Sequence, residues 1–351
     1  MKIGLTYDLR QEYLVQGFSE EETAEFDRQD TIQAIESVLQ DFGFVTDPIG
    51  NIFSLTKKIA GGQSWDLVFN IAEGLKGYAR EAQVPALLEA FNIPYTFSDP
   101  LVLSLSLHKA MTKRVIRDLG IPTPDFFMVE TLSDISRVNL SFPLFAKPVA
   151  EGTGKGISPS SKIENRQDLE NVCQKLLTTY NQPVLIETFL PGREFTVGLL
   201  GTGKDAEAIG TLEIVLLDQA EPTVYSYLNK ERCEDLVEYR KINEPLTDKA
   251  QKIARAVWQC LGCRDAGRVD LKIDVHGIPN VIEVNPLAGL HPDHSDLPIL
   301  CKSVGISYHH LIERIISSAL KRTKPLQPGS TKLSHFKNYC QPVNSLSLIS
   351  S

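Results

Sequence analysis

Two carboxylates and an amide interrupt an apolar stretch near the C-terminal end of the chain, in RVDLKIDVHGIPNVIEVNP, residues 268–286. The segments on either side of His276-Gly277 alternate apolar and polar residues, which is the pattern of half-buried β-strands. A two-residue hairpin turn suits His-Gly, because glycine adopts the positive φ that such turns need. The sequence therefore predicts a hairpin that carries Asp270, Glu283 and Asn285.

The register of this hairpin would gather its polar side chains. The predicted turn sets Val275 opposite Ile278, Asp270 opposite Glu283 and Arg268 opposite Asn285. Side chains two residues apart share a strand face, so Arg268, Asp270, Glu283 and Asn285 would form one polar cluster. Carboxylates directly opposite each other repel, and a cation between them relieves this. Such oxygen ligands suit Mg²⁺, which binds few protein carboxylates together with substrate phosphates. The alternative is a hairpin without metal in which Arg268 and Lys272 balance the acids.

A glycine-rich loop offers a second piece of chemistry. Lys147 lies on a predicted strand just before three alternating glycines in AKPVAEGTGKGIS. Such loops expose N–H groups that cradle phosphates. This loop matches neither the Walker A pattern nor the dinucleotide-binding fingerprint, and a plain flexible connection is the alternative. Thirty residues later, PVLIETFLPGREF carries Glu187 and Glu194. We expect an ATP-binding site, because the chain combines a strand that carries a lysine, a glycine loop, an acidic strand edge and a hairpin with metal-ligand residues.

Hydrophobic periodicity predicts the elements that position these groups. Strands at 2–7 and 65–74, a helix within 28–44, and a helix and short strand within 82–99 give a βαβ-type alternation, hence a parallel sheet. Residues 108–126 read as a basic amphipathic helix that ends at Gly120. Further strands are expected at 142–150, 183–190, 193–201 and 207–217, and helices at 165–180, 247–262 and 307–322. The composition after Lys324 predicts a loosely ordered tail.

Composition excludes several classes. The chain has 351 residues, 42% hydrophobic and 23% charged, so it suits a globular protein of two or three domains. The net charge of −8 gives no basic field for nucleic acid. We expect no membrane association, because no apolar run approaches the roughly 20 residues that span a bilayer. The N-terminus lacks a signal-peptide pattern, and six cysteines stand without secretory context, so we expect a cytoplasmic protein. Cys260 and Cys263 form a CxxC that is better explained as packing than as a zinc or redox site.

Several segments in order over residues 66–316 resemble the ATP-grasp superfamily, and most closely the D-alanine–D-alanine ligases. They are VFNIAEG, IPYTFSDP, LHKAMTKRV, FPLFAKPVAEGTGKGI, VLIETFLPGREFTVG, RVDLKID and VIEVNPLAGL. The resemblance implies an α/β protein whose ATP-grasp part is α+β. Its N-terminal parallel-sheet domain would span 1–100, a central lid subdomain 101–187 and a C-terminal subdomain with the metal site 188–322, with ATP sandwiched between the two subdomains. Residues 323–351 would form the tail.

The resemblance also implies roles for individual residues. For the nucleotide these are Lys109 and Lys147 at the phosphates, Thr153 and Gly154 in the covering loop, Glu187, Thr188 and Leu190 at the adenine, Glu194 at the ribose, and Lys230 on a mobile loop over the γ-phosphate. Asp270, Glu283 and Asn285 would bind two Mg²⁺ ions, with Mn²⁺ as an alternative. Arg268 would steady the transferring phosphoryl group, and Gly289 and Ser295 would receive a substrate carboxylate.

The implied activity is ATP- and Mg²⁺-dependent ligation of a small-molecule carboxylate to an amine, through an acyl phosphate. The substrates would be amino acids, and a homodimer is one option because relatives of the fold dimerise. The match weakens where the family binds substrates. Residues 8–26 lack the family's Ser-Ala-Glu-type segment, its His-Gly becomes Glu73-Gly74, its Gly-Glu-Asp-Gly loop becomes GYAREAQVP, and the usual proline of its Leu-Pro-Gly turn is Ala288. Arg80 could bind a substrate carboxylate or pair internally with Glu73 or Glu81.

Three other functions compete with this one. A metal-dependent hydrolase could use His291, Asp293, His294 and Asp296. A non-catalytic module could sense ATP, although the phosphate lysines and metal ligands are all present. A ligase could also use an acceptor other than an amine.

Overall fold

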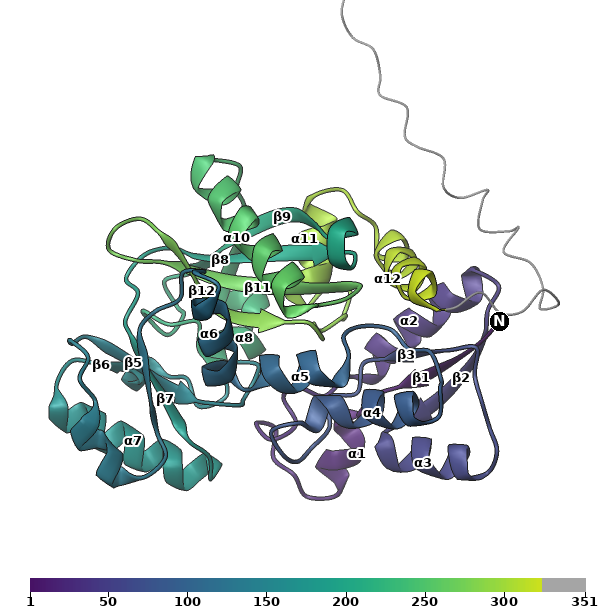
Figure 1. Cartoon of the computed structure of the whole chain (residues 1–351), viewed down its shortest axis with the longest axis horizontal. Helices are drawn as coiled ribbons and strands as arrows, with labels where there is room; N and C mark the ends of the chain where they lie inside the picture. The colour runs from purple at the N-terminus through teal and green to yellow at the C-terminus, as the bar shows by residue number, and fades with distance from the viewer. Residues whose placement is uncertain (324–351) are drawn as a thin grey trace, which may run out of the picture.

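The computed structural model describes residues 1–323 and forms three β-sheets in sequence order (Figure 1). The predicted tail from residue 324 onward lies outside the described residues. No helix within 1–323 combines the length and apolar character needed to cross a membrane. The cytoplasmic location, the homodimer and the domain boundaries stay predictions.

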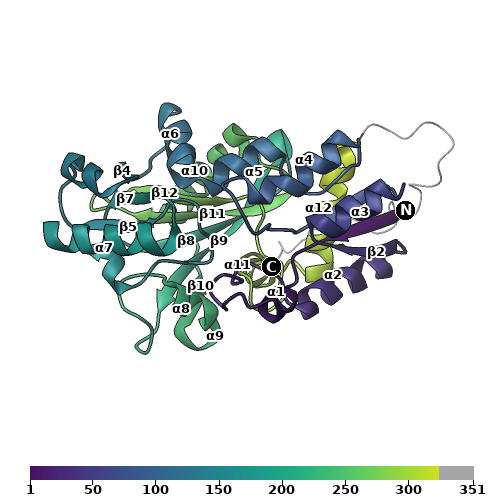
Figure 2. The ribbon, with the colours of Figure 1, turned by 90° about the horizontal axis from the view of Figure 1, so that it is seen from below.

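The first sheet is parallel, as the βαβ alternation predicted, with strand order β2-β1-β3. Its strands are β1 (Lys2–Thr6), β2 (Val45–Gly50) and β3 (Leu67–Asn70), and its helices are α1 (Arg10–Val15), α2 (Gln29–Asp41), α3 (Ile52–Ala60), η1 (Arg80–Ala82) and α4 (Gln83–Ala90). In β3, Leu67 and Phe69 face the core with α2, whereas Val68 faces the core with α3 and α4. The helices therefore cover both faces of the sheet (Figure 2). The short strand expected near residue 95 is reduced to one bridge, between Val68 and Tyr95.

The middle sheet is antiparallel, with strand order β4-β7-β5-β6. Its elements are β4 (Phe126–Val129), η2 (Leu132–Arg137), β5 (Leu144–Pro148), η3 (Pro159–Ser161), β6 (Lys162–Ile163), α7 (Arg166–Tyr180) and β7 (Val184–Thr188). Leu169, Cys173 and Leu176 of α7 pack on Leu144 and Ile186 of the sheet. The other face of this sheet packs partly on α5 (Pro100–Leu107) and α6 (Lys109–Asp118), through Leu185 against Leu107 and Ala110, and partly lines the cleft described below.

The third sheet has strand order β10-β9-β8-β11-β12. Its strands are β8 (Glu194–Leu200), β9 (Glu207–Leu216), β10 (Val237–Lys241), β11 (Ala266–Ile273) and β12 (Pro279–Asn285). The remaining helices are α5 (Pro100–Leu107), α6 (Lys109–Asp118), η4 (Gly203–Asp205), α8 (Tyr227–Glu231), α9 (Cys233–Leu236), α10 (Pro245–Leu261), α11 (Asp296–Ser303) and α12 (Tyr308–Arg322). Cys263 is buried in the core beneath α10, as expected for a packing residue, but Cys260 is exposed.

Long-range packing joins the three parts of the chain. The last helix, α12, shares one core with β1 and α2, through Ile312 and Ile315 against Leu5 and Ile35. Residues of α5 and α6 pack with α10 in the core of the third sheet, although both helices precede the middle sheet in sequence. The middle sheet is thus flanked in sequence by segments that belong to the same core.

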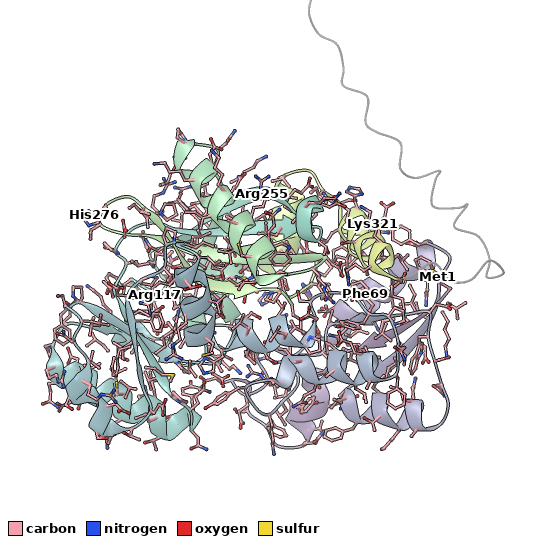
Figure 3. The ribbon with its side chains drawn as sticks, in the orientation of Figure 1. Met1, Phe69, Arg117, Arg255, His276 and Lys321 are labelled. Atoms are coloured by element: carbon pink, nitrogen blue, oxygen red, sulfur yellow. The ribbon has the colours of Figure 1, made fainter. Side chains whose placement is uncertain are left out.

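The β11–β12 hairpin has the predicted register at its polar end but not at its turn. Asp270 pairs with Glu283 and Arg268 with Asn285, as expected. At the tip, Asp274 N donates to Ile278 O at 3.0 Å, so the loop has three residues, with His276 exposed at its end (Figure 3). The predicted two-residue turn is therefore wrong. A β-bulge after Asp270 restores the register, because Ile282 is the extra residue in β12.

Candidate active site

Two cavities meet beside this hairpin: one lies between the middle and third sheets, and the other between the hairpin and the N-terminal part of the chain. The first, here the lysine cleft, has Lys109, Lys147, Lys155, Lys230 and Lys272 in its wall. The second, here the acidic cavity, is lined by the carboxylates of Glu25, Asp27, Glu73, Glu81, Glu231, Glu283 and Asp296. Lys109, Tyr225, Lys230 and Glu283 line both. The two cavities therefore adjoin at these four side chains.

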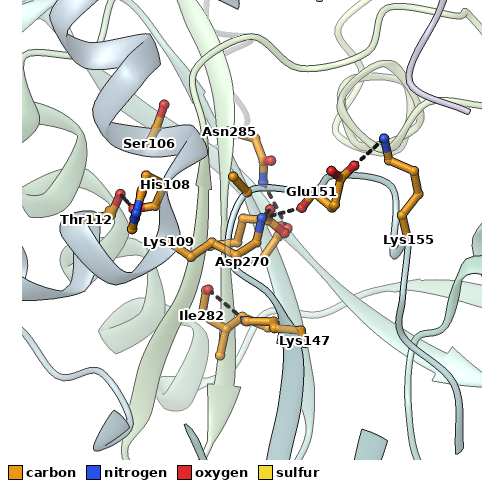
Figure 4. A network of polar contacts seen from close by, with 12 residues as sticks. Ser106, His108, Lys109, Thr112, Lys147, Glu151, Lys155, Asp270, Ile282 and Asn285 are labelled. Atoms are coloured by element: carbon orange, nitrogen blue, oxygen red, sulfur yellow. Dashed lines mark hydrogen bonds and ion pairs between the residues drawn. The ribbon is translucent and has the colours of Figure 1, made fainter. Parts of the chain in front are cut away.

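The polar cluster predicted on the hairpin is present. Asp270 Oδ2 accepts hydrogen bonds from Arg268 Nη1 at 2.5 Å and Asn285 Nδ2 at 3.1 Å, and the second of these is drawn in Figure 4. The Thr196 hydroxyl donates to the other oxygen of Asp270. Because Asn285 donates through its amide nitrogen, its side-chain oxygen is left for a ligand.

Lys109 rather than Lys272 balances the second acid of the hairpin. Lys109 Nζ lies 2.8 Å from Glu283 Oε1, at the start of α6. Burial alone would raise the pKa of Glu283, but Lys109, Lys230 and Lys147 lower it to about 2. Lys272 instead pairs with Glu194 across β11 and β8 at 2.8 Å. In the metal-free alternative, Arg268 and Lys272 would balance the two hairpin acids. Arg268 does pair with Asp270, but Lys272 pairs with Glu194 instead.

A second ion-pair group lies deep in the lysine cleft. Glu187 is 3% exposed and lies 2.5 Å from Lys113 Nζ and 2.9 Å from Lys147 Nζ. Burial lowers the pKa of Lys113 to about 8 against the attraction of Glu187. Lys147 also lies 3.5 Å from the carbonyl oxygen of Ile282, the bulge residue (Figure 4). Sequence reasoning missed Lys113, although it stands one helical turn after Lys109 on the same face of α6.

The residues expected at the adenine and ribose line the lysine cleft. Glu187, Thr188, Leu190 and Glu194 all lie in its wall. The Thr188 N–H is already bonded to Asp125 O at 2.9 Å, so a ligand at this edge would use other backbone groups. The carboxylate of Glu194 is held by Lys272, which keeps it at the rim.

The glycine loop closes over the two cavities. Thr153 lines the acidic cavity and Gly154 lines the lysine cleft. A Cβ at Gly154 would lie 2.9 Å from the backbone nitrogen of Tyr227 at a φ of +72°, so glycine is needed where the loop meets α8. Lys230, on α8, lies 4.8 Å from the centre of the Tyr225 ring, and its charge lowers the pKa of Glu283.

Arg80 does not line the acidic cavity. Its Nη2 lies 3.0 Å from Glu25 Oε2, and its Nη1 donates to Ala150 O at 2.9 Å. Lys155 of the glycine loop lies 2.8 Å from the same Glu25 and also pairs with Glu151. Arg80 thus forms an internal ion pair with Glu25, rather than with Glu73 or Glu81 as the sequence suggested. Its binding of a substrate carboxylate stays a prediction, and Glu25 is a residue that sequence reasoning missed.

The loop of residues 289–295 lines the acidic cavity, as expected for Gly289 and Ser295. Ser295 Oγ accepts from His291 N at 3.0 Å, and a Cβ at Gly289 would lie 2.8 Å from that oxygen. The four residues of the proposed hydrolase site have separate partners: His291 pairs with Asp30, Asp293 with Lys302, His294 with Glu234 and Asp296 with Arg268. They do not converge on one metal position. Within residues 1–323, the set of His, Cys and acidic residues close enough to share an ion is Cys233, Glu234 and His294.

Comparisons with known proteins agree with this geometry. The sequence model of the family described as "D-ala D-ala ligase C-terminus" matches residues 115–317. An uncharacterized Sinorhizobium fredii protein, y4sG, is 33% identical over 73% of this chain and 75% of its own length. A D-alanine–D-alanine ligase of Marinomonas sp. is 33% identical over 82% of this chain and 85% of its own. A D-alanine–D-alanine ligase of Bordetella avium is 34% identical over 69% of this chain and 75% of its own length.

Solved structures show the same fold. D-Alanine–D-alanine ligase from Bacillus anthracis in complex with ATP superposes with a TM-score of 0.69 over 92% of this chain and 98% of that one, at 22% identity. VanG D-Ala:D-Ser ligase from Enterococcus faecalis superposes with the same TM-score over 91% of this chain and 99% of that one, at 20% identity.

Proposed function

Because the chain belongs to the D-alanine–D-alanine ligase family, and is thus an ATP-dependent carboxylate–amine ligase that uses a divalent metal, we propose that it joins two small amino acids. MgATP would occupy the lysine cleft and the amino acids the acidic cavity. The observation that carries this proposal is the junction of the two cavities at Lys109, Lys230 and Glu283. An acidic cavity of about 180 Å³ suits substrates of amino-acid size.

The donor set on the hairpin fits a hard divalent cation, and Mg²⁺ is our proposal for it. Carboxylate oxygens of Asp270 and Glu283 and the free amide oxygen of Asn285 are the ligand types that Mg²⁺ prefers. When bound with ATP, the metal would neutralise charge on the phosphate oxygens. The acids would then be balanced by the metal instead of by Lys109 and Arg268, which frees both for the substrates.

The reaction that follows from the family has two steps. A carboxylate oxygen of the first substrate attacks the γ-phosphorus of ATP, and ADP leaves. The amine of the second substrate then attacks the acyl carbon, loses a proton and expels phosphate. Both steps develop negative charge on oxygen, which Lys230 at the junction of the cavities and Arg268 in the wall of the acidic cavity would stabilise. Positioning and charge carry such a reaction, so no nucleophilic side chain is required.

Lys109, Lys147, Glu187 and Glu194 would hold the nucleotide, with Thr188, Leu190 and the loop of Thr153 and Gly154. Gly289 and Ser295 would receive a substrate carboxylate at the far wall of the acidic cavity. A sensor that binds ATP without reacting is not favoured, because family members are named ligases.

Phosphate release from MgATP with pooled D- and L-amino acids tests the proposal. We expect release that depends on amino acids, that Glu283→Ala abolishes, and that Glu170→Gln leaves intact. Glu170 is a matched control, since it is an exposed acid on the outer helix α7. Omitting pool members one at a time would identify the substrates. Tight ATP binding without amino-acid-dependent release would contradict the proposal.

A further inference from the structure

Three side chains with metal-binding atoms meet away from the hairpin, at the edge of the acidic cavity. Cys233 and Glu234 begin α9, and His294 lies on the loop of residues 289–295 and lines the cavity. The thiol sulfur, a carboxylate oxygen and a ring nitrogen of these residues all lie within 4.8 Å of one another. The three residues are here called the thiol cluster.

The spacing within the thiol cluster is close to that of ligands around one ion. His294 Nδ1 lies 3.7 Å from Cys233 Sγ and 2.7 Å from Glu234 Oε1. Around a tetrahedral Zn²⁺, with bonds of about 2.3 Å to sulfur and about 2.0–2.1 Å to nitrogen or oxygen, the corresponding separations are about 3.6 Å and about 3.3 Å. The sulfur and the nitrogen are therefore already placed, and the exposed side chain of Glu234 needs to retreat by only about 0.6 Å.

The chemistry of the cluster also favours a bound cation. Cys233 is buried, and its sulfur has only a long contact of 3.9 Å with the carbonyl oxygen of His294 besides the ring nitrogen. Burial raises the pKa of the Cys233 thiol to about 11, against a hydrogen bond with Tyr239 that lowers it, and the charge of Glu234 raises it further. A metal ion reverses this balance, because it displaces the thiol proton and attracts both the thiolate and the carboxylate.

The ligand types select the metal. A thiolate, an imidazole and a carboxylate together are a donor set that Zn²⁺ binds, whereas Mg²⁺ prefers oxygen ligands alone. Three protein ligands leave the fourth tetrahedral position to water. The thiol cluster and the oxygen ligands of the hairpin would therefore sort two kinds of divalent metal between them.

The thiol cluster joins two segments that border the active site. Cys233 follows Lys230 by three residues, through the end of α8. His294 precedes Ser295 on the loop that lines the acidic cavity. An ion held by both segments would tie the segment that carries Lys230 to this loop, and would fix Lys230 at the junction of the cavities.

We propose that Cys233, Glu234 and His294 form a binding site for Zn²⁺, separate from the metal ligands of the hairpin, and that the bound ion slows turnover by restraining the segment of Lys230. On binding, the sulfur–metal bond forms as the thiol proton leaves to solvent, and no oxidation state changes. The site itself is independent of the proposed function, whereas the slowing rests on it.

Titration of the full-length protein with Co²⁺, without nucleotide, tests the site. A thiolate–Co²⁺ bond gives a charge-transfer absorption in the near ultraviolet that oxygen ligands do not give. We expect one equivalent of Co²⁺ to produce this band and Zn²⁺ to abolish it. Cys233→Ala should remove the band, and Glu234→Gln, at an exposed position that folding tolerates, should weaken Co²⁺ binding about tenfold or more. Cys260→Ser is the matched control, because it removes an exposed cysteine elsewhere.

Absence of the band in the wild type, or a band that persists in Cys233→Ala, would overturn the site. Phosphate release in excess Mg²⁺ should fall by half or more when one equivalent of Zn²⁺ is added to the wild type, and should not fall in Cys233→Ala, each measured against its own zinc-free rate. An unchanged rate in the wild type, or an equal loss in both proteins, would overturn the restraint and leave the ligase function standing. No release even without Zn²⁺ would overturn the proposed function and the restraint together, while the Co²⁺ titration would still decide the site.

Discussion

Replacing Glu25 by glutamine should destabilise the protein strongly and loosen the glycine loop. The side chain of Glu25 is 8% exposed and pairs with both Arg80 and Lys155. Burial works against its charge, but Arg80 and Lys155 lower the pKa of Glu25 from 4.5 to about 2. That gap corresponds to about 3 kcal/mol of unfolding free energy. Removing one partner of a buried ion pair costs about 3–5 kcal/mol in other proteins, so the two estimates agree.

The pH dependence has a defined sign. Because the pKa of Glu25 is lower in the folded state, its stabilisation is complete above pH 4.5 and is lost as the pH falls from 4.5 towards 2. The difference between wild type and Glu25→Gln should therefore be constant at about 3 kcal/mol near neutral pH and shrink below pH 4.5.

Urea unfolding followed by the fluorescence of Trp65 and Trp258 measures this difference, since the first tryptophan lies in the core beside β3 and the second in the core of the third sheet. Glu22→Gln is the matched control: it is an exposed acid on the same segment, and glutamine can keep its contacts with Ser19. A Glu25→Gln protein within 0.5 kcal/mol of wild type at pH 7, roughly the effect of an ordinary surface substitution, would refute the reasoning.

Two further substitutions test the lysine cleft. Gly154→Ala places a Cβ 2.9 Å from Tyr227 N at a positive φ, so calorimetric titration should show ATP affinity about tenfold weaker or worse; unchanged affinity would mean that the loop does not close as described. Lys113→Met leaves Glu187 paired with Lys147 and removes a cation whose burial already offsets part of its attraction to Glu187, so it should lower the unfolding free energy by only about 1 kcal/mol. Thermal denaturation beside Lys175→Met, a control on the outer helix α7, would measure it, and equal melting temperatures would contradict the role given to Lys113.

The hairpin shows how far sequence reasoning reached and why it stopped. Alternation along β11 and β12 was enough to pair Asp270 with Glu283, because side-chain period and burial constrain register strongly. The turn was predicted wrongly, since His-Gly suits a two-residue loop locally while the tip closes between Asp274 and Ile278. The bulge at Ile282 shifts the register by one residue, so Asp270 still pairs with Glu283 despite the longer loop. The alternation of apolar and polar residues gave no sign of this bulge.

Other elements were missed for the same kind of reason. The edge strand β2, VTDPIG, is half-buried or exposed apart from a single buried residue and holds a proline, so it has no clear alternation to detect. Glu25 was unremarkable in a polar segment, and only folding brings it to Arg80, 55 residues away, and to Lys155, 130 residues away.

Taken by itself, the sequence determined the order and type of the main elements, the parallel first sheet and the acids of the hairpin, because periodicity and residue chemistry are local properties. Tertiary structure alone decided which charges are paired. It assigned Lys109 to Glu283, Lys113 to Glu187 and Arg80 to Glu25. The physical reason is that an ion pair needs two groups within about 4 Å, and for residues far apart in the chain that distance is set by the packing of whole sheets and helices.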